Sequence, residues 1–201
     1  RRLLLGAPPA TAPPERPNWE DLVARWRARE GRARPSERFT SPTRLEEAAE
    51  GEPQAPAEAA VEIGRACHRV LEALDFSRPV VPEGIPPEAV EILERFFRSE
   101  AFEELASSEI LARELPFVVP RGEQIVQGVL DVVYRKDGIL YVGDYKTDKM
   151  LEPGRYEVIR ELYTEAARRI FPGMRPRFRL IDLRRGRMVE LEAARPPGGE
   201  A

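Results

Sequence analysis

Cysteine is almost absent from this chain, whose 201 residues include only Cys67. A single cysteine excludes an intramolecular disulfide and any cluster held by four cysteines of one chain, so no iron–sulfur cluster is expected. The lack of disulfides is typical of a reducing compartment, and we predict a cytoplasmic location. Cys67 itself is predicted to be a small core residue rather than a reactive thiol.

Long apolar segments are absent too. No run approaches the roughly 20 apolar residues that span a bilayer, and no signal peptide is visible, so no membrane partner is expected. The chain also lacks a Gly-x-x-x-x-Gly-Lys-Ser/Thr loop, which excludes a P-loop nucleotide site. It begins Arg1-Arg2-Leu3-Leu4-Leu5 without methionine, which predicts a piece of a longer polypeptide.

Lysine is scarce, since only Lys136, Lys146 and Lys149 occur among the 32 lysines and arginines. The net charge of −3 gives no broad basic surface of the kind that free-standing nucleic-acid-binding domains carry. In a chain that avoids lysine so strongly, a lysine at position 146, within an Asp-x-Lys sequence, indicates a specific role.

The chain does contain a clear succession of helix and strand patterns. We expect residues 1–38 to be a proline-rich linker with a helix at 19–29, residues 39–192 to form the main domain, and residues 193–201 to be a disordered tail. Within the main domain, a helix is expected after Ser41-Pro42 and a second linker at 51–56. Further helices are predicted at 57–74, 87–97, 100–107 and 156–171, and strands at 114–119, 124–134, 139–146, 177–183 and 187–191. This order predicts an α/β fold with a mixed central sheet flanked by helices and a helical N-terminal part.

The strands at 124–134 and 139–146 are predicted to form a tight hairpin, because Asp137-Gly138 between them favours a two-residue turn. Counting outward from this turn pairs Asp131 with Asp144, whose Cβ atoms then lie roughly 4.5–5.5 Å apart. Two carboxylates facing each other between apolar strand residues repel, and a divalent cation would relieve the repulsion. The hairpin is therefore a candidate metal centre.

Lys146 completes the pattern, because side chains two apart on a strand share a face and Lys146 then lies beside Asp144. There its ammonium group can position or deprotonate a water molecule. Carboxylates suit a hard ion such as Mg²⁺ or Mn²⁺. Two carboxylates, a lysine and such an ion are the minimum for metal-assisted hydrolysis of a phosphodiester.

These residues resemble a known family. The sequences Gly128-x-x-Asp131 and Asp144-Tyr145-Lys146-Thr147 resemble the motifs of the PD-(D/E)xK nucleases. The helix segment from Gly64 to Glu72 is similar to the Gly-x-x-x-His-x-x-Leu-Glu motif of a narrower group, the RecB/AddA nuclease domains of recombination helicases. The resemblance covers residues 39–192 and implies a restriction-endonuclease-like core.

The resemblance also implies roles. His68, Asp131, Asp144 and the Tyr145 carbonyl would hold the Mg²⁺ or Mn²⁺, and Lys146 would serve the attacking water. The implied activity is exonuclease-type cleavage of DNA in end processing and recombinational repair, with a helicase as a domain or subunit partner. A domain that receives DNA from a helicase needs less positive charge of its own.

One family motif is incomplete here. The family carries Gln-x-x-x-Tyr on the helix after the Asp-Tyr-Lys strand, a motif that the resemblance implies contacts DNA or supports the site. Tyr163 fits the tyrosine, while Ile159 replaces the glutamine. Arg155 and Arg160 are candidates to replace the lost phosphate contact. Glu72, one helical turn after His68, could orient His68 or reach a second ion. Glu114 on the preceding strand is a further candidate ligand.

Alternatives remain open at this level. His68 alone would more often be an ordinary helix histidine, and Asp-x-Lys alone occurs by chance in many chains. A non-catalytic nuclease-like module, which binds DNA or docks within a helicase complex, is a second hypothesis. A restriction-type endonuclease on the same core is a third.

Overall fold

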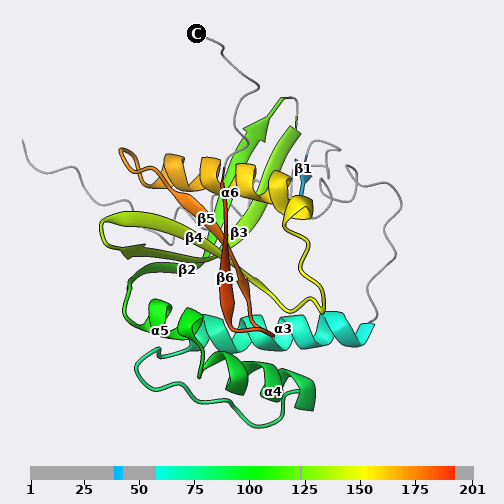
Figure 1. Ribbon diagram of the computed structural model, residues 1–201. Coiled ribbons are helices and arrows are strands. Elements are labelled where there is room, and N and C mark those ends of the chain that lie inside the picture. The colour runs from blue at the N-terminus through cyan, green and yellow to red at the C-terminus, as the bar shows by residue number, and fades with distance from the viewer. Residues whose placement is uncertain (1–38, 43–57, 123, 193–201) are drawn as a thin grey trace, which may run out of the picture. The chain divides into compact units, whose positions relative to one another are not determined.

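The computed structural model describes residues 39–42, 58–122 and 124–192, which form an α/β fold around a six-stranded mixed sheet (Figure 1). The strands are β1 (Phe39–Thr40), β2 (Glu109–Arg121), β3 (Gln124–Lys136), β4 (Ile139–Lys146), β5 (Arg177–Asp182) and β6 (Arg187–Leu191). The helices are α3 (Glu58–Ala73), α4 (Pro87–Phe96), α5 (Glu100–Ala106), α6 (Glu157–Ile170) and the 3₁₀ helix η1 (Pro153–Tyr156). The fold class predicted from the sequence is confirmed.

Several predicted segments lie outside the described residues. They are the linker at 6–17, the helix at 19–29, the body of the helix after Ser41-Pro42, the linker at 51–56 and the tail at 193–201. In the part of the chain that the structure describes, no helix is long and apolar enough to cross a membrane.

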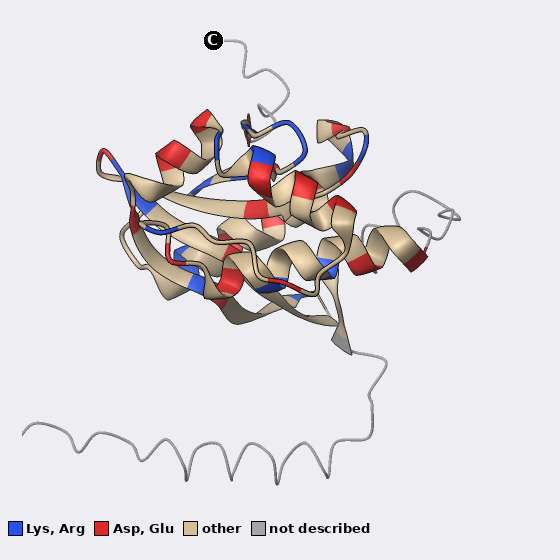
Figure 2. Cartoon of the chain, turned by 90° about the horizontal axis from the view of Figure 1, so that it is seen from below, with Lys and Arg blue, Asp and Glu red and all other residues tan. Residues whose placement is uncertain are grey.

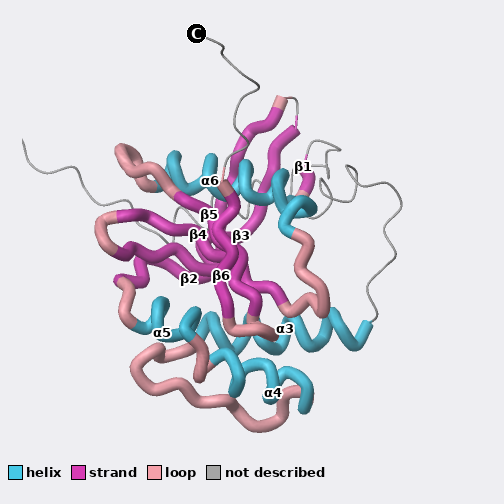
Figure 3. The backbone as a smooth tube through the Cα atoms, viewed as in Figure 1, coloured by secondary structure: helices cyan, strands magenta, loops and turns pink. Residues whose placement is uncertain are grey.

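The sheet combines antiparallel and parallel pairs (Figure 3). Strands β2, β3 and β4 form an antiparallel meander, β4 pairs parallel with β5 through the α6 crossover, and β6 returns antiparallel to β5. Strand β1 pairs parallel with the beginning of β3. Helices α3, α4 and α5 cover one face of the sheet and α6 covers the other, so that two hydrophobic clusters fill the space between the layers.

The hairpin predicted from Asp137-Gly138 is present. Both residues have positive φ, 50° and 78°, as the two central positions of a type I′ turn require. The ladder runs from Lys136–Ile139 up to Val132–Gly143, which is the register obtained by counting outward from the turn.

Strand β2 is longer than the predicted strand at 114–119. It pairs with β3 from Glu109 to Arg121, although Pro116 and Pro120 interrupt the apolar pattern. Proline is tolerated because β2 is an edge strand that pairs, among the described strands, with β3 alone. The N–H groups that the prolines lack are therefore not needed for hydrogen bonds to a second neighbouring strand.

Candidate metal centre

The candidate site lies where the β3–β4 hairpin forks. The regular ladder ends at the Val132–Gly143 pair, and the next residue of β3, Asp131, replaces the missing backbone bond. Its carboxylate Oδ2 accepts a hydrogen bond from the Tyr145 backbone N–H at 2.8 Å. Gly143 stands at the fork because a Cβ there would lie 2.6 Å from the Ile181 side chain.

Strand β2 brings a third carboxylate to the same level. Its ladder with β3 includes Arg113–Val132 and Leu115–Leu130 but skips the intervening position, where Glu114 faces Asp131. Glu114 has a φ of 44°, which is unusual for a residue with a side chain and costs about 1 kcal/mol or more. Glu114, Asp131 and Asp144 therefore stand in a row on three neighbouring strands.

His68 reaches this row from α3. Its Nε2 lies 3.1 Å from the Tyr145 carbonyl oxygen, and its Nδ1 lies 3.7 Å from Asp131 Oδ2 and 4.0 Å from Glu114 Oε1. Burial lowers the pKa of His68, against the opposing effects of the Asp144 charge and the Tyr145 carbonyl, so the neutral ring is favoured. A neutral ring that donates from Nε2 directs the lone pair of Nδ1 at two carboxylates.

The donor set fits a divalent cation. One ligand atom each from His68, Glu114 and Asp131 can be chosen so that all lie within 4.8 Å of one another. Ligands of one octahedral ion at roughly 2.1 Å lie roughly 3 Å apart, so small side-chain adjustments suffice. Burial and the neighbouring Asp144 raise the pKa of Asp131 well above its usual range, which is the electrostatic cost that a cation would offset.

Asp144 and Lys146 form the second half of the site, on one face of β4 as predicted. Lys146 Nζ lies 2.9 Å from Asp144 Oδ2 and 4.9 Å from the centre of the Tyr156 ring. Although burial lowers the pKa of Lys146, the Asp144 carboxylate outweighs it and raises the pKa above its ordinary value. The contact between Lys146 Nζ and Asp144 Oδ2 does not have the orientation of a regular hydrogen bond. Among the described residues, Asp144 Oδ2 is therefore a buried oxygen that accepts no hydrogen bond.

The segment after Lys146 is held by the turn between β5 and β6. The Lys146 carbonyl accepts a hydrogen bond from the Leu183 N–H at 3.0 Å, and Arg184 donates to the Thr147 carbonyl. Asp182, which is fully buried beside Lys146 in the parallel ladder, accepts from the Arg185 N–H and side chain. These contacts fix the end of β4 on which Lys146 stands.

A cleft of about 480 Å³ opens over the His68 side of the site. It is lined by Gly64, Arg65, His68, Arg69, Glu72 and Glu114. Glu72 therefore belongs to the site's surroundings, and its charge contributes, after burial, to the raised pKa of Glu114.

Three other residues predicted for DNA contact or site support do not line this cleft. Tyr163 lies on the buried side of α6, where its ring packs against Phe117 and Phe178. Arg160 is also buried and paired with Glu157 at 2.8 Å, because α6 turns it toward its own first turn. Arg155 is exposed on η1, outside the residues that line the cleft. Their placement does not support phosphate contact by Arg155 or Arg160, or DNA contact by Tyr163. Support of the site by Tyr163 stays a prediction.

Glu114 was only a further candidate ligand in the sequence analysis, but the structure places its carboxylate beside His68 and Asp131. A signal for it was present in the turn between β2 and β3. Counting outward from the Arg121–Gln124 pair places Glu114 opposite Asp131, just as the next turn places Asp144 there. The long strand needed for that count was obscured by the prolines of β2.

Comparisons with known proteins find a partial sequence similarity and a similar fold. No family model matches the chain. A stretch of 64 residues is 42% identical to an ATP-dependent helicase/nuclease of Staphylococcus aureus, in strains JH9, Mu3 and NCTC 8325 alike. The match covers 26% of this chain and 5% of those proteins, so the chain spans only a small part of their length.

A solved structure from Eubacterium rectale, assigned as an exonuclease, has a similar fold. The TM-score is 0.51, the identity is 14%, and the match covers 77% of this chain and 73% of that one. The chain is thus similar to a short part of a helicase/nuclease, and its fold is similar to that of the Eubacterium rectale structure.

Proposed function

We propose that this chain is a Mg²⁺- or Mn²⁺-dependent deoxyribonuclease domain of the PD-(D/E)xK type that hydrolyses DNA without a covalent intermediate. One observation carries the proposal: donor atoms of His68, Glu114 and Asp131 converge beside the Lys146–Asp144 pair. Burying carboxylates beside a neutral imidazole costs free energy when no positive charge is near, and the same groups are suitable ligands for a divalent cation.

His68, Asp131, Asp144 and the Tyr145 carbonyl would hold the ion, with Glu114 as an additional ligand. When bound, the ion would polarise a phosphoryl oxygen and lower the pKa of a water molecule. Asp131 also fixes the fork of the hairpin through its bond to the Tyr145 N–H.

Lys146 acts as a charged donor in this proposal. The Asp144 carboxylate keeps the pKa of its ammonium group high, which favours orienting a water or a phosphate oxygen over taking a proton from the water. Of the two roles that the sequence allows, positioning and deprotonation, the first is therefore the one proposed.

The context of the activity is also part of the proposal. Exonuclease-type action in DNA end processing and recombinational repair, with a helicase in the same polypeptide or as a separate chain, follows from the resemblance of the motifs. The similarity to a helicase/nuclease over 64 residues supports it.

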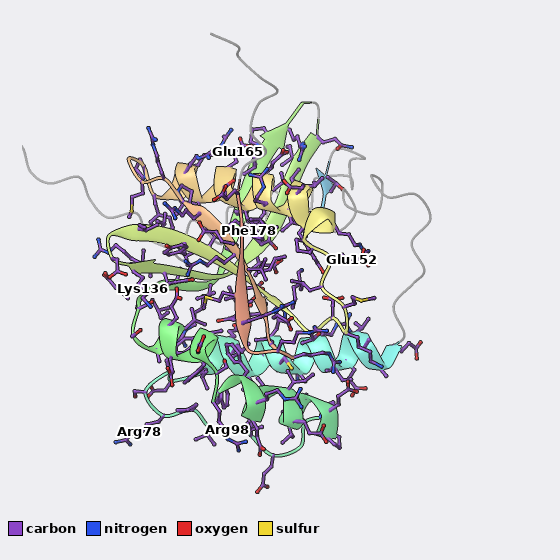
Figure 4. All side chains as sticks on the ribbon, in the orientation of Figure 1. Arg78, Arg98, Lys136, Glu152, Glu165 and Phe178 are labelled. Carbon is purple, nitrogen blue, oxygen red and sulfur yellow. The ribbon has the colours of Figure 1, made fainter. Side chains whose placement is uncertain are left out.

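The test compares two lysines of one hairpin. Lys146→Ala and Asp144→Ala are expected to abolish cleavage of linear DNA in Mg²⁺ or Mn²⁺, while Lys136→Ala remains active. Lys136 is the matched control because it stands at the turn end of the same hairpin (Figure 4). Circular dichroism melts establish that each variant is folded, and EDTA is expected to stop the wild-type protein.

Two outcomes would contradict the proposal. Metal-dependent cleavage by purified Asp144→Ala would show that cleavage does not depend on this site. Wild-type protein that binds DNA but cleaves neither linear nor circular DNA in either ion would favour the non-catalytic module. Nicking of a supercoiled plasmid would instead favour a restriction-type endonuclease over an end-dependent enzyme.

A further inference from the structure

Within residues 58–122 and 124–192, most arginine side chains form hydrogen bonds or ion pairs with other groups. Examples are Arg179 with Glu104 and Glu190, Arg184 with Glu88, and Arg135 with Glu109. Among the residues that the structure describes, the arginine side chains without such a hydrogen bond or ion pair are Arg65, Arg69, Arg78, Arg168 and Arg175. These exceptions are all exposed, and each is a free cation on the surface.

Three of these free arginines gather along one route. Arg65 and Arg69 line the cleft above His68, and Arg69 also lines a second hollow of about 460 Å³ between α3 and the segment 75–86. Arg78 lines that second hollow and projects outward from the loop after α3 (Figure 4). The route therefore runs along α3, from the candidate metal centre through the shared residue Arg69 to Arg78.

The spacing on α3 suits a chain of phosphates. Arg65 and Arg69 are one helical turn apart, about 6 Å along the axis, so both guanidinium groups project from the same side as His68. Arginine binds phosphate with a planar pair of N–H donors, and an arginine without a carboxylate partner keeps these donors available.

We propose that Arg65, Arg69 and Arg78 bind successive phosphates of the DNA strand that enters the metal centre. This inference rests on the proposed nuclease function and adds the path of its substrate. Figure 2 shows acidic and basic residues interspersed rather than one broad basic face, and the net charge is −3. A local path of three arginines would let such a chain bind DNA without a broad basic face. The second hollow adds apolar walls, including Val70, Leu74 and Ile85, against which bases can lie.

The experiment measures binding of a short fluorescent oligothymidylate by anisotropy in EDTA, over a series of salt concentrations. Each of Arg65→Ala, Arg69→Ala and Arg78→Ala is expected to weaken binding about fivefold. Each is also expected to reduce the slope of log affinity against log salt by about 0.7, the value for one lost phosphate contact with a single strand. The corresponding lysine variants should keep the slope.

Arg168→Ala and Arg175→Ala are the matched controls, since both arginines are exposed and free but lie outside both hollows. They should bind as the wild type does. The proposal is overturned if the controls weaken binding as much as the three path variants, if the path variants keep wild-type affinity and slope, or if the wild type does not bind at low salt.

The use of EDTA separates this inference from the proposed function. If the wild type never cleaves in Mg²⁺ or Mn²⁺ but the path variants bind weakly, the path stands and the nuclease proposal fails. If the wild type cleaves and the path variants bind normally, the nuclease proposal stands and the path fails.

Discussion

Asp131 combines opposite demands at a single residue. It supports the fold by accepting the Tyr145 N–H, and it opposes the fold because it is buried beside Asp144 and near Glu114. An asparagine would keep an acceptor oxygen for the N–H and remove the charge. A substitution of this residue can therefore change stability and the proposed activity in opposite directions.

Asp131→Asn is expected to stabilise the metal-free protein at neutral pH while it abolishes cleavage. Removing one of two neighbouring buried charges should raise the free energy of unfolding by about 1 kcal/mol, or the melting temperature by roughly 2–4 °C. Thermal denaturation in EDTA measures this change. Asp137→Asn, in the exposed hairpin turn, is the control and should shift stability by less than about 0.5 kcal/mol. A melting temperature of Asp131→Asn below that of the wild type would contradict the prediction.

Cys67 gives a second prediction at the same scale. It is fully buried, as expected from the sequence, and burial raises the pKa of its thiol to about 11. The Arg184 charge lowers this pKa and the Glu88 charge raises it, both to a smaller extent. Alkylation by iodoacetamide at pH 8 should therefore be slow in the native protein and fast in denaturant, because the thiolate is the nucleophile. Mass spectrometry counts the modified fraction, and equal rates in both states would refute the buried position.

The sign of the pH effect of Cys67 follows from the same shift. The folded state holds the thiol protonated up to about 11, whereas the unfolded thiol ionises near 9.0. Its stabilising effect is thus complete below pH 9.0 and is lost as the pH rises through about 11. The difference in stability between the wild type and Cys67→Ala should shrink over that range.

At the scale of elements, the β3–β4 hairpin sets the position of Asp131 relative to Asp144. The turn needs positive φ at two successive residues, and a glycine at the second of them avoids the strain that a side chain would meet. The turn is therefore both a local signal in the sequence and the origin of the register at the site.

Gly138→Ala should lower the free energy of unfolding by about 1 kcal/mol, because alanine is strained at a φ of 78°. Gly154→Ala is the matched control, since Gly154 has no positive φ and a Cβ there would meet nothing within 4 Å. Urea denaturation of both variants measures the difference. Equal stability of the two would show that the turn is not strained by a side chain.

At the scale of the whole molecule, binding of a divalent ion should increase the free energy of unfolding. A ligand that binds only the folded state stabilises it by about 2.7 kcal/mol at 100 times its dissociation constant. The melting temperature of the wild type should therefore rise with Mg²⁺ or Mn²⁺ concentration, and this rise should be lost in His68→Ala. A wild-type melting temperature that depends on neither ion would argue against a site at the fork.

The sequence by itself determined the local parts of this protein. The Asp137-Gly138 turn, the apolar periodicity of α3 and α6, and the strand pattern of β3 and β4 depend on residues close together in the chain. They sufficed for the fold class, for the hairpin register that brings Asp131 to the level of Asp144, and for the shared face of Asp144 and Lys146. Local backbone preferences and side-chain alternation decide these features without the rest of the molecule.

Only the tertiary structure decided which distant residues meet. Packing of α3 against the sheet brings His68 to the Tyr145 carbonyl, and the full length of β2 brings Glu114 to Asp131. Packing of α6 buries Tyr163 and Arg160 away from the cleft, although the family resemblance made both of them candidates for DNA contact. These outcomes depend on how layers pack and on which arginines find a carboxylate, and both are properties of the folded surface rather than of any short stretch of sequence.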